Sequence, residues 1–307
     1  MEAATPVVPA GWTEWQQLQP ALHFDTRSLA ETLDGGQAFR WNRAAPASDV
    51  WQGVWSHCLA RLTLDAEGGL LWSSPEPLAT RVSAQLPDYL AGECDFAAWA
   101  HSLPLAGDEN LRRAVEGWPD LRILRQPLGE TLFAFLCSST KQIVQIKQIC
   151  EEVAAAFGPE IAAGVHALPD WSALAHVSEN QLRACRLGYR ARYIHETAQF
   201  LAAAPTFLDE LEKQPLEEAR QQLLKLPGVG PKIADCVLLF GAGRLDAFPI
   251  DTWILKALRE LYGLDAAWRA AHLERFAQIH FAPCPGLAQQ FLFALMRNRR
   301  KQTNLVD

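Results

Sequence analysis

Residues 226–236 read LPGVGPKIADC, and they give the clearest structural signal in the chain. Gly228 and Gly230 permit the positive φ angles and the close backbone approach that a tight turn between two helices needs. Pro231 suits the first turn of the second helix. The backbone amides at such a helix start point outward, where they can bind a phosphate. The stretch therefore predicts a helical hairpin at about residues 217–243 that can contact a nucleic-acid backbone of any sequence.

The residues around this hairpin divide the chain into two parts of different periodicity. Residues 50–74 mix Trp, Val and Leu with polar residues, and the EGG at 67–69 is typical of a hairpin turn between strands. From about residue 108 apolar residues recur at helical spacing, in segments that end at Gly or Pro. These segments predict helices over 130–158, 217–226, 231–243, 251–263 and 286–300. The expected fold class is α+β, with an N-terminal antiparallel β-sheet domain over residues 1–107 and an all-α body over residues 108–307.

The composition favours an intracellular globular protein. The 307 residues are 49% apolar, which is ample for a packed core. The N-terminal stretch MEAATPVVPAGWTEW lacks the basic and apolar regions of a signal peptide, and no run approaches the roughly 18 apolar residues of a membrane helix. We therefore expect a cytoplasmic protein, or a nuclear one in a eukaryote. The seven cysteines are odd in number and scattered, which favours reduced thiols over disulfides or a metal cluster.

The charge balance restricts how this chain can bind nucleic acid. Its net charge of −7 argues against a general polyanion binder, so a contact with nucleic acid has to come from a local basic face or from backbone amides. One basic cluster, RNRRK at 297–301, is either such a face or a solvated helix end.

A lysine and an aspartate follow the hairpin turn at positions that suit chemistry. Lys232 is the second residue of the expected hairpin helix, and Cys236 shares its face four residues on. Asp251, in the sequence FPIDTWILKAL, stands where a helix N-cap belongs. A lone N-cap aspartate is usually structural. A Pro-x-Asp helix start soon after a glycine-rich hairpin is much less common.

Several motifs together resemble one family. The hairpin, Lys232 and Asp251 resemble the helix-hairpin-helix/GPD superfamily of DNA glycosylases, and within it the 8-oxoguanine DNA glycosylase/AP lyase family. The further segments that resemble this family are DGGQAFRW (34–41), LFAFLCSS (132–139), LGYRARY (187–193) and AQQFLF (288–293). They run in the family's order from about residue 20 to residue 300. The resemblance implies a TBP-like N-terminal sheet domain and a bifunctional glycosylase/AP lyase that acts in base-excision repair.

The resemblance also implies roles for individual residues. Lys232 is expected to attack the sugar at C1′, and Asp251 to stabilise the positive charge that develops there. The carbonyl of Gly36 is expected to accept a hydrogen bond from N7 of 8-oxoguanine. The flipped base is expected to stack between Phe293 and Cys236. Gln289 is expected to reach the Watson–Crick edge of the base. Tyr189 is expected to be the wedge in the duplex, with Arg190 facing the orphaned base. Further DNA contacts are expected from Gly228, Gly230, Thr140 and Gln142.

The sequence departs from the family pattern in three places. Thr140-Lys141-Gln142 replaces an asparagine run that helps to read the opposite cytosine. Trp253 replaces a histidine two residues after the aspartate, and Met296 replaces an aspartate near the base pocket. None of these changes touches Lys232 or Asp251, so the catalytic class is better supported than the opposite-base preference.

The resemblance implies duplex DNA with a damaged purine as the partner of a monomeric enzyme. It implies no organic cofactor and no metal ligand set, although a monovalent cation at the hairpin carbonyls would fit the family.

Two alternative functions stay open. One is a glycosylase for alkylated purines of the 3-methyladenine class, and the other is a non-catalytic binder of DNA structure that uses only the hairpin. Lys232 argues against both. An endonuclease III-type enzyme is disfavoured, because Cys284 is the single cysteine beyond the hairpin and that branch carries a four-cysteine iron–sulfur cluster.

Overall fold

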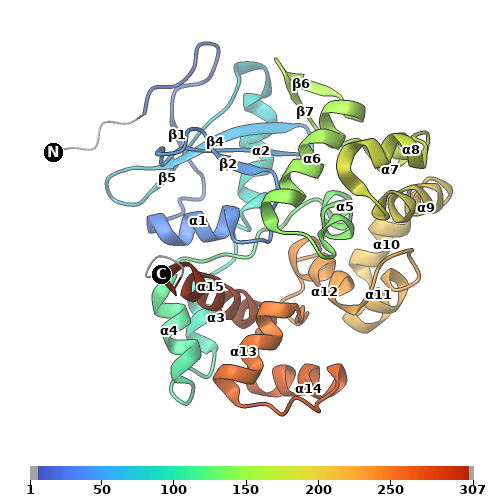
Figure 1. Ribbon diagram of the computed structural model, residues 1–307. Helices are drawn as coiled ribbons and strands as arrows, with labels where there is room; N and C mark the ends of the chain where they lie inside the picture. The colour runs from blue at the N-terminus through green and yellow to red at the C-terminus, as the bar shows by residue number, and fades with distance from the viewer. Residues whose placement is uncertain (1–5, 304–307) are drawn as a thin grey trace.

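The N-terminal part of the protein is a five-stranded antiparallel sheet. The computed structural model describes residues 6–303, so the first five residues of the N-terminal stretch considered above lie outside the described residues. The strands follow the order β1-β5-β4-β3-β2 (Figure 1). Their bounds are β1 (Gln16–Gln17), β2 (Trp41–Arg43), β3 (Trp51–Trp55), β4 (Cys58–Leu64) and β5 (Leu70–Ser73). The predicted hairpin at 67–69 is confirmed, because β4 pairs with β5 around this turn.

Two helices complete the core of the sheet domain. They are α1 (Thr26–Asp34) and α2 (Ala79–Tyr89), preceded by the short turn η1 (Glu76–Leu78). The indole N–H of Trp41 donates to the hydroxyl of Tyr89 over 2.9 Å, and the rings of Trp41 and Trp55 stack at 5.8 Å. Aromatic side chains thus fill the space between the sheet and α2, where each removes a large apolar area from water.

The rest of the chain is a helical body around one continuous core. A small hairpin of β6 (Glu160–Ala162) and β7 (Val165–His166) lies beside it. The helices are α3 (Phe96–Ser102), α4 (Glu109–Gly117), α5 (Leu128–Ser138), α6 (Ile143–Phe157), α7 (Trp171–Leu174), α8 (Glu179–Leu182), η2 (Arg183–Leu187), α9 (Arg190–Ala203), α10 (Phe207–Lys213), α11 (Leu216–Leu223), α12 (Pro231–Phe240), α13 (Thr252–Tyr262), α14 (Ala270–His280) and α15 (Pro285–Thr303).

The prediction of one helix over 130–158 is wrong. The chain forms α5 and α6 instead, separated by a turn at residues 139–142. Thr140 adopts a φ of 56°, a left-handed conformation that no α-helix accommodates. The apolar spacing continues across the break because both helices bury a face in the same core, so periodicity alone could not locate the turn.

The two parts of the protein are closely joined at both ends of the helical body. Phe96 and Ala100 of α3 belong to the core of the helical body, although they precede the boundary that the sequence predicts at 107/108. At the other end, α15 returns to α1 (Figure 1), and Arg297 donates to the carbonyl of Asp34 over 2.7 Å. Arg297 is therefore an interdomain contact and not part of a solvated helix end. The side chains of residues 300–303 lie outside the described part of the chain.

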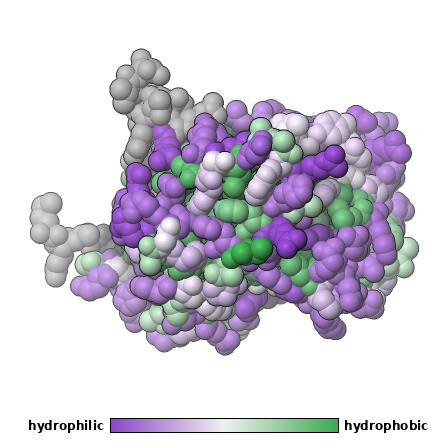
Figure 2. Space-filling model, turned by 90° about the horizontal axis from the view of Figure 1, so that it is seen from below, coloured by the Kyte–Doolittle hydropathy of each residue, from purple (hydrophilic) through white to green (hydrophobic). Residues whose placement is uncertain are grey.

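The surface of the molecule is mainly polar. Figure 2, seen from the side on which α13 and α14 lie in Figure 1, shows hydrophilic residues over most of this face and only small apolar patches. Among residues 6–303, no helix combines the length and the apolar character needed to cross a membrane.

Candidate active site and DNA interface

The predicted helical hairpin is confirmed as α11 and α12. Gly228 has a φ of 78°, and a Cβ at this position would lie 2.5 Å from the ring of Tyr193. Gly230 does not adopt the positive φ that glycine permits. It is the extended N-cap of α12, with a φ of −99°. A Cβ at Gly230 would meet no atom within 4 Å, so the space beside this residue, at the start of α12, is open. An ion pair of 2.8 Å between Arg220 and Asp235 joins the two helices.

Lys232 lies in the first turn of α12, with its amine held against α5. Its Nζ donates to the hydroxyl of Ser138 over 3.2 Å and lies 5.0 Å from the centre of the Phe135 ring. The side chain also reaches Cys236 one turn further along α12. Ser138 is a contact that the sequence did not predict, although it lies in the motif LFAFLCSS.

Asp251 is the N-cap of α13, as predicted. Its carboxylate accepts the backbone N–H of Ile254 over 2.8 Å. Burial raises the pKa of Asp251, and the N–H of Ile254 and the charge of Lys232 partly oppose this rise. The two predicted residues therefore lie close enough to interact, although they come from different helix starts.

Cys236 completes this group. It is buried on α12, and burial raises the pKa of its thiol to about 12, so the thiol is neutral. Ser138, Lys232, Cys236 and Asp251 are called the reactive cluster below. Among the described residues no group of three or more His, Cys, Asp and Glu side chains could hold a metal ion.

Gly36 and Phe293 lie against each other, although 257 positions separate them in the sequence numbering. Gly36 has a φ of 88°, and a Cβ there would lie 3.2 Å from Cδ1 of Ile143 and 3.4 Å from Cζ of Phe293. The conformation and the space at this position therefore both favour glycine. Ile143, the first residue of α6, is a neighbour that the sequence did not predict.

Gln289 lies one turn before Phe293 on α15 and is 4% exposed. Its side-chain oxygen is buried and has no hydrogen-bond partner in the protein. Leaving such a group unpaired costs about 1–3 kcal/mol, a cost that a polar ligand would remove. Gly36, Ile143, Gln289 and Phe293 are called the recognition cluster below.

A buried glutamine fixes the backbone beside Gly36. The amide of Gln37 donates to the carbonyl of Arg122 over 2.8 Å, and its oxygen accepts the N–H of Leu124 over 2.8 Å. Gln126 in turn donates to the carbonyl of Gln37 over 2.6 Å. The segment that carries Gly36 is thus held from both sides. The sequence marks Gln37 only as a member of the motif DGGQAFRW.

Phe135 connects the two clusters. Its ring lies under the amine of Lys232 and forms an edge-to-face contact of 5.3 Å with Phe39, three residues after Gly36. The helices α5 and α6 supply Ser138 to the reactive cluster and Ile143 to the recognition cluster. An aromatic core therefore holds the amine and the segment that carries Gly36 in a fixed relation.

Tyr189 lies at the surface beside the α5–α6 turn. It is 48% exposed, its hydroxyl donates to Oγ of Ser139 over 3.3 Å, and its ring meets that of Tyr193 edge-to-face at 6.0 Å. Since Tyr193 also packs against Gly228, the exposed tyrosine and the hairpin are coupled through one ring.

Arg190, which the resemblance expects to face the orphaned base, is buried in the structure. Its side chain is only 3% exposed. Its guanidinium donates to the carbonyl of Ser139, to the hydroxyl of Thr140 over 2.9 Å and to the carbonyl of Leu187 over 3.3 Å. Its position follows from these acceptors, which turn the side chain inward.

The positions that depart from the family pattern lie in three different settings. Thr140 and Gln142 are exposed in the turn, and the amide oxygen of Gln145 accepts the N–H of Gln142 over 3.0 Å. Met296 is buried on α15. Trp253 is half-buried in the first turn of α13, where its N–H approaches the carboxylate of Asp251.

Comparisons with known proteins identify the family of this chain. Residues 133–281 match the family described as HhH-GPD superfamily base excision DNA repair protein. The N-glycosylase/DNA lyase OGG1 of Arabidopsis thaliana is 32% identical over 259 residues, which are 80% of this chain and 68% of the relative.

Two solved structures share the fold. One is MBOgg1 in complex with a low-affinity DNA ligand, with a TM-score of 0.82 and 31% identity over 91% of this chain and 94% of the other. The other is the 8-oxoguanine glycosylase/lyase of Clostridium acetobutylicum bound to duplex DNA with cytosine opposite the lesion, with a TM-score of 0.81 and 25% identity over 94% and 99%. The chain belongs to the 8-oxoguanine DNA glycosylase/AP lyase family of the HhH-GPD superfamily.

Proposed function

We propose that this protein is a bifunctional DNA glycosylase/AP lyase that excises 8-oxoguanine from duplex DNA in base-excision repair. One observation carries the proposal: the amine of Lys232 and the buried carboxylate of Asp251 belong to two different helix starts and lie close enough to interact. The relatives named above, an N-glycosylase/DNA lyase and an 8-oxoguanine glycosylase/lyase, support the same activity.

Excision breaks the bond between C1′ of the deoxyribose and N9 of the base. The electron pair of this bond leaves with the base, which then takes up a proton, and positive charge develops on the sugar. The Asp251 carboxylate stabilises that charge. Once the ammonium group of Lys232 has given a proton to solvent, its amine attacks C1′ through Nζ and then loses a second proton, so that a carbon–nitrogen bond replaces the glycosidic bond.

Strand cleavage follows from the same covalent bond. Opening of the sugar ring at O4′ converts the C1′ adduct into a protonated Schiff base. This group withdraws electrons, so that a proton leaves C2′ and the C3′–O bond breaks with loss of the 3′ phosphate. The lysine therefore supplies both activities, and hydrolysis of the Schiff base releases it.

The recognition cluster provides groups that suit an oxidised purine. In 8-oxoguanine N7 carries a hydrogen and can donate to the carbonyl of Gly36, whereas N7 of guanine is an acceptor and is repelled. Hydrogen-bond differences of this kind discriminate strongly, because the wrong base leaves a buried group unpaired. The unpaired amide oxygen of Gln289 suits the Watson–Crick edge of the base, and Phe293 and Cys236 suit its two faces.

The hairpin and the α5–α6 turn provide the contacts with duplex DNA. The open amides that follow Gly228 and Gly230 suit a phosphate, which explains how a chain with net charge −7 can bind DNA. A monovalent cation at the hairpin carbonyls would strengthen this contact. Tyr189 is the wedge that enters the duplex when the base leaves the stack, and Thr140 and Gln142 lie beside the opposite strand. The enzyme acts as a monomer in the compartment that holds the DNA, the cytoplasm or a nucleus.

The test uses end-labelled duplexes that carry 8-oxoguanine, 3-methyladenine or guanine at one position. The proposal predicts release of 8-oxoguanine and a strand break at the same site without alkali, with guanine left intact. Release of 3-methyladenine alone would show that the substrate is an alkylated purine and not 8-oxoguanine. Release of a base without a strand break would show that the protein is a glycosylase without lyase activity.

A further inference from the structure

The end of α1 lies against α15, directly before the segment that carries Gly36. Arg297 of α15 is the first residue of the basic cluster RNRRK, and its side chain is only 16% exposed. Its Nη1 donates to the carbonyl of Asp34 over 2.7 Å, and its Nη2 donates to the carboxylate of Glu31 over 3.2 Å. The charge of this arginine is therefore directed at the end of α1, where a cation also stabilises the helix dipole.

Glu31 connects this arginine to the backbone that precedes Gly36. Its side chain is 4% exposed, and the oxygen that pairs with Arg297 also accepts the amide of Asn298 over 3.4 Å. The other oxygen lies against Gly35, where an added Cβ would come within 2.7 Å of it. A buried ion pair is stable only with both charges in place, because a charge left alone in the interior is strongly unfavourable. The pair therefore fixes the end of α1 relative to α15.

The same stretch of α15 carries the aromatic ring of the recognition cluster. Phe293 and Arg297 are four residues apart, which places them on one side of the helix. The amide of Gln290 donates to the carbonyl of Gly35 over 3.3 Å. Phe293, which contacts Gly36, lies between the two residues that make these bonds. One helix thus presents the ring and anchors the segment that lies against it.

Resting on the function proposed above, we infer that Arg297 is a positioning residue for recognition of the flipped base. Through Glu31 and the carbonyl of Asp34 it holds the end of α1 on α15, so that Gly36 keeps its place against the ring of Phe293. This role requires no contact of the arginine with the base or with a phosphate. It affects the rate because a displacement of about 1 Å in a recognition group can cost on the order of 100-fold.

The test compares two reactions of each variant under single-turnover conditions. Arg297→Gln removes the charge and the fork, and excision of 8-oxoguanine is expected to slow by about 10- to 100-fold. A preformed abasic site has no base to be recognised, so β-elimination there is expected to stay within about twofold of the unmodified protein.

A milder variant keeps the test valid if Arg297→Gln does not fold. Arg297→Lys keeps a positive charge beside Glu31, so the buried carboxylate is not left alone. Its ammonium lacks the planar fork that joins Glu31 to the carbonyl of Asp34. Excision is therefore expected to slow by about 3- to 30-fold, again with β-elimination within about twofold.

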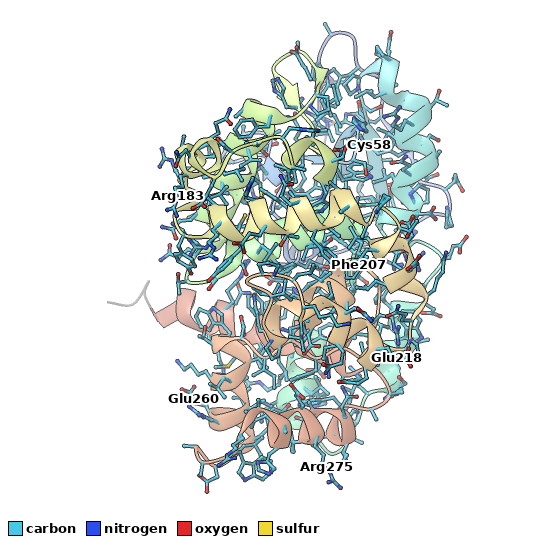
Figure 3. All side chains as sticks on the ribbon, turned by 90° about the vertical axis from the view of Figure 1, so that its right-hand side faces the viewer. Cys58, Arg183, Phe207, Glu218, Glu260 and Arg275 are labelled. Carbon is cyan, nitrogen blue, oxygen red and sulfur yellow. The ribbon has the colours of Figure 1, made fainter. Side chains whose placement is uncertain are left out.

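A double variant separates positioning of Gly36 from an independent defect. Gly36→Ala disturbs the same segment, so its combination with Arg297→Gln is expected to be within about threefold of the slower single variant. Arg275→Gln is the control for the lost charge. It removes a positive charge from an exposed position on α14, at the lower edge of the molecule in Figure 3, and both reactions should keep their rates.

Three results would overturn the inference while the proposed function stands. Equal losses in excision and in β-elimination would give Arg297 a general structural role. Losses that multiply in the double variant would show that Arg297 does not act through Gly36. Unchanged excision by both Arg297 variants would show that this contact does not govern recognition. If the unmodified protein excises no 8-oxoguanine from any duplex, the proposed function itself fails, and this result is distinguishable from the other three.

Discussion

The reactive cluster and the α5–α6 turn lie side by side but are built in different ways. Lys232 and Asp251 stand at helix starts, where short-range rules set the backbone: a proline-led first turn and an N-cap carboxylate. The turn at residues 139–142 is held in part by Arg190, which is 50 positions further along the sequence numbering. The backbone of the reactive cluster is therefore encoded locally, whereas the α5–α6 turn also depends on tertiary contacts.

The largest effect should come from the amine. Lys232→Gln keeps a polar side chain, one bond shorter than lysine, that cannot form a Schiff base, so excision with strand cleavage should fall by at least about 10³-fold. Single-turnover gel assays measure this loss. Lys256→Gln is the matched control, because Lys256 is an exposed lysine that pairs with Glu260 on α13. Lyase activity retained by Lys232→Gln would show that another residue is the nucleophile. The reactive cluster would then no longer be the place where the chemistry is encoded.

A substitution at Asp251 can separate its catalytic role from its role as a helix cap. Asparagine caps helices as well as aspartate, so Asp251→Asn should keep the bond to Ile254. Because burial raises the pKa of Asp251, removal of its charge should not lower the free energy of unfolding at neutral pH. Excision should nevertheless fall by about 10²- to 10³-fold, because the charge that stabilises the sugar is gone. Rates and denaturant unfolding measured on one preparation test both statements. A variant that loses stability and activity in parallel would make Asp251 only a cap.

The pH dependence provides a second test of Asp251. Burial raises its pKa, and the ionised form is the one that stabilises positive charge. The excision rate should therefore fall as the pH decreases through this raised pKa, at a pH above the ordinary value of 3.8 for aspartate. Asp251→Asn should lack this acidic limb. Equal pH profiles for the two proteins would contradict the assignment.

A smaller effect is expected in the recognition cluster. Gly36→Ala places a Cβ 3.2 Å from Ile143 and 3.4 Å from Phe293 at a φ of 88°, so it should lower excision by about 10- to 100-fold. Gly164→Ala is the control for the strain alone, because Gly164 has a φ of 70° with no atom within 4 Å of the added Cβ. Equal excision rates for the two variants would show that Gly36 has no specific role in recognition of the base.

The smallest effect concerns a buried acid outside both clusters. Burial raises the pKa of Glu130 to about 7, and its carboxylate accepts the N–H of Ser56 over 2.8 Å. The folded protein thus binds a proton here below pH 7, whereas the unfolded chain does so only near 4.5. The contribution of Glu130 to stability should rise as the pH falls from 7 to 4.5.

Glu130→Gln removes this charge and keeps the acceptor. The variant should gain on the order of 1–2 kcal/mol in the free energy of unfolding at pH 8, and less at pH 5, with an unchanged excision rate. Urea unfolding at the two pH values measures the gain. Together with Asp251→Asn this sharpens the comparison, because the same acid-to-amide change should lower the excision rate at Asp251 and leave it unchanged at Glu130.

What the sequence could predict follows the same division. The hairpin, the helix starts of Lys232 and Asp251 and the strand turn at 67–69 depend on neighbouring residues, and the structure contains all of them. The break at 139–142 was missed because the apolar pattern runs through it.

The burial of Arg190 and the contacts of Ser138 and Gln37 were missed for a related reason. Their partners are distant in sequence, and no local pattern indicates them. The wedge motif marked Arg190 for attention, but only the fold determines whether its side chain faces DNA or the protein.

The measurement that tests the central claim most directly locates the covalent bond. The protein is mixed with a duplex that carries 8-oxoguanine, trapped with borohydride, digested with trypsin and analysed by mass spectrometry. A modified Lys232 resists trypsin, so the account predicts a sugar-bearing peptide of residues 226–244 in place of the unmodified peptide of residues 226–232. An adduct on another amine, or an unmodified 226–232 peptide from a trapped complex, would contradict the assignment of Lys232 as the nucleophile.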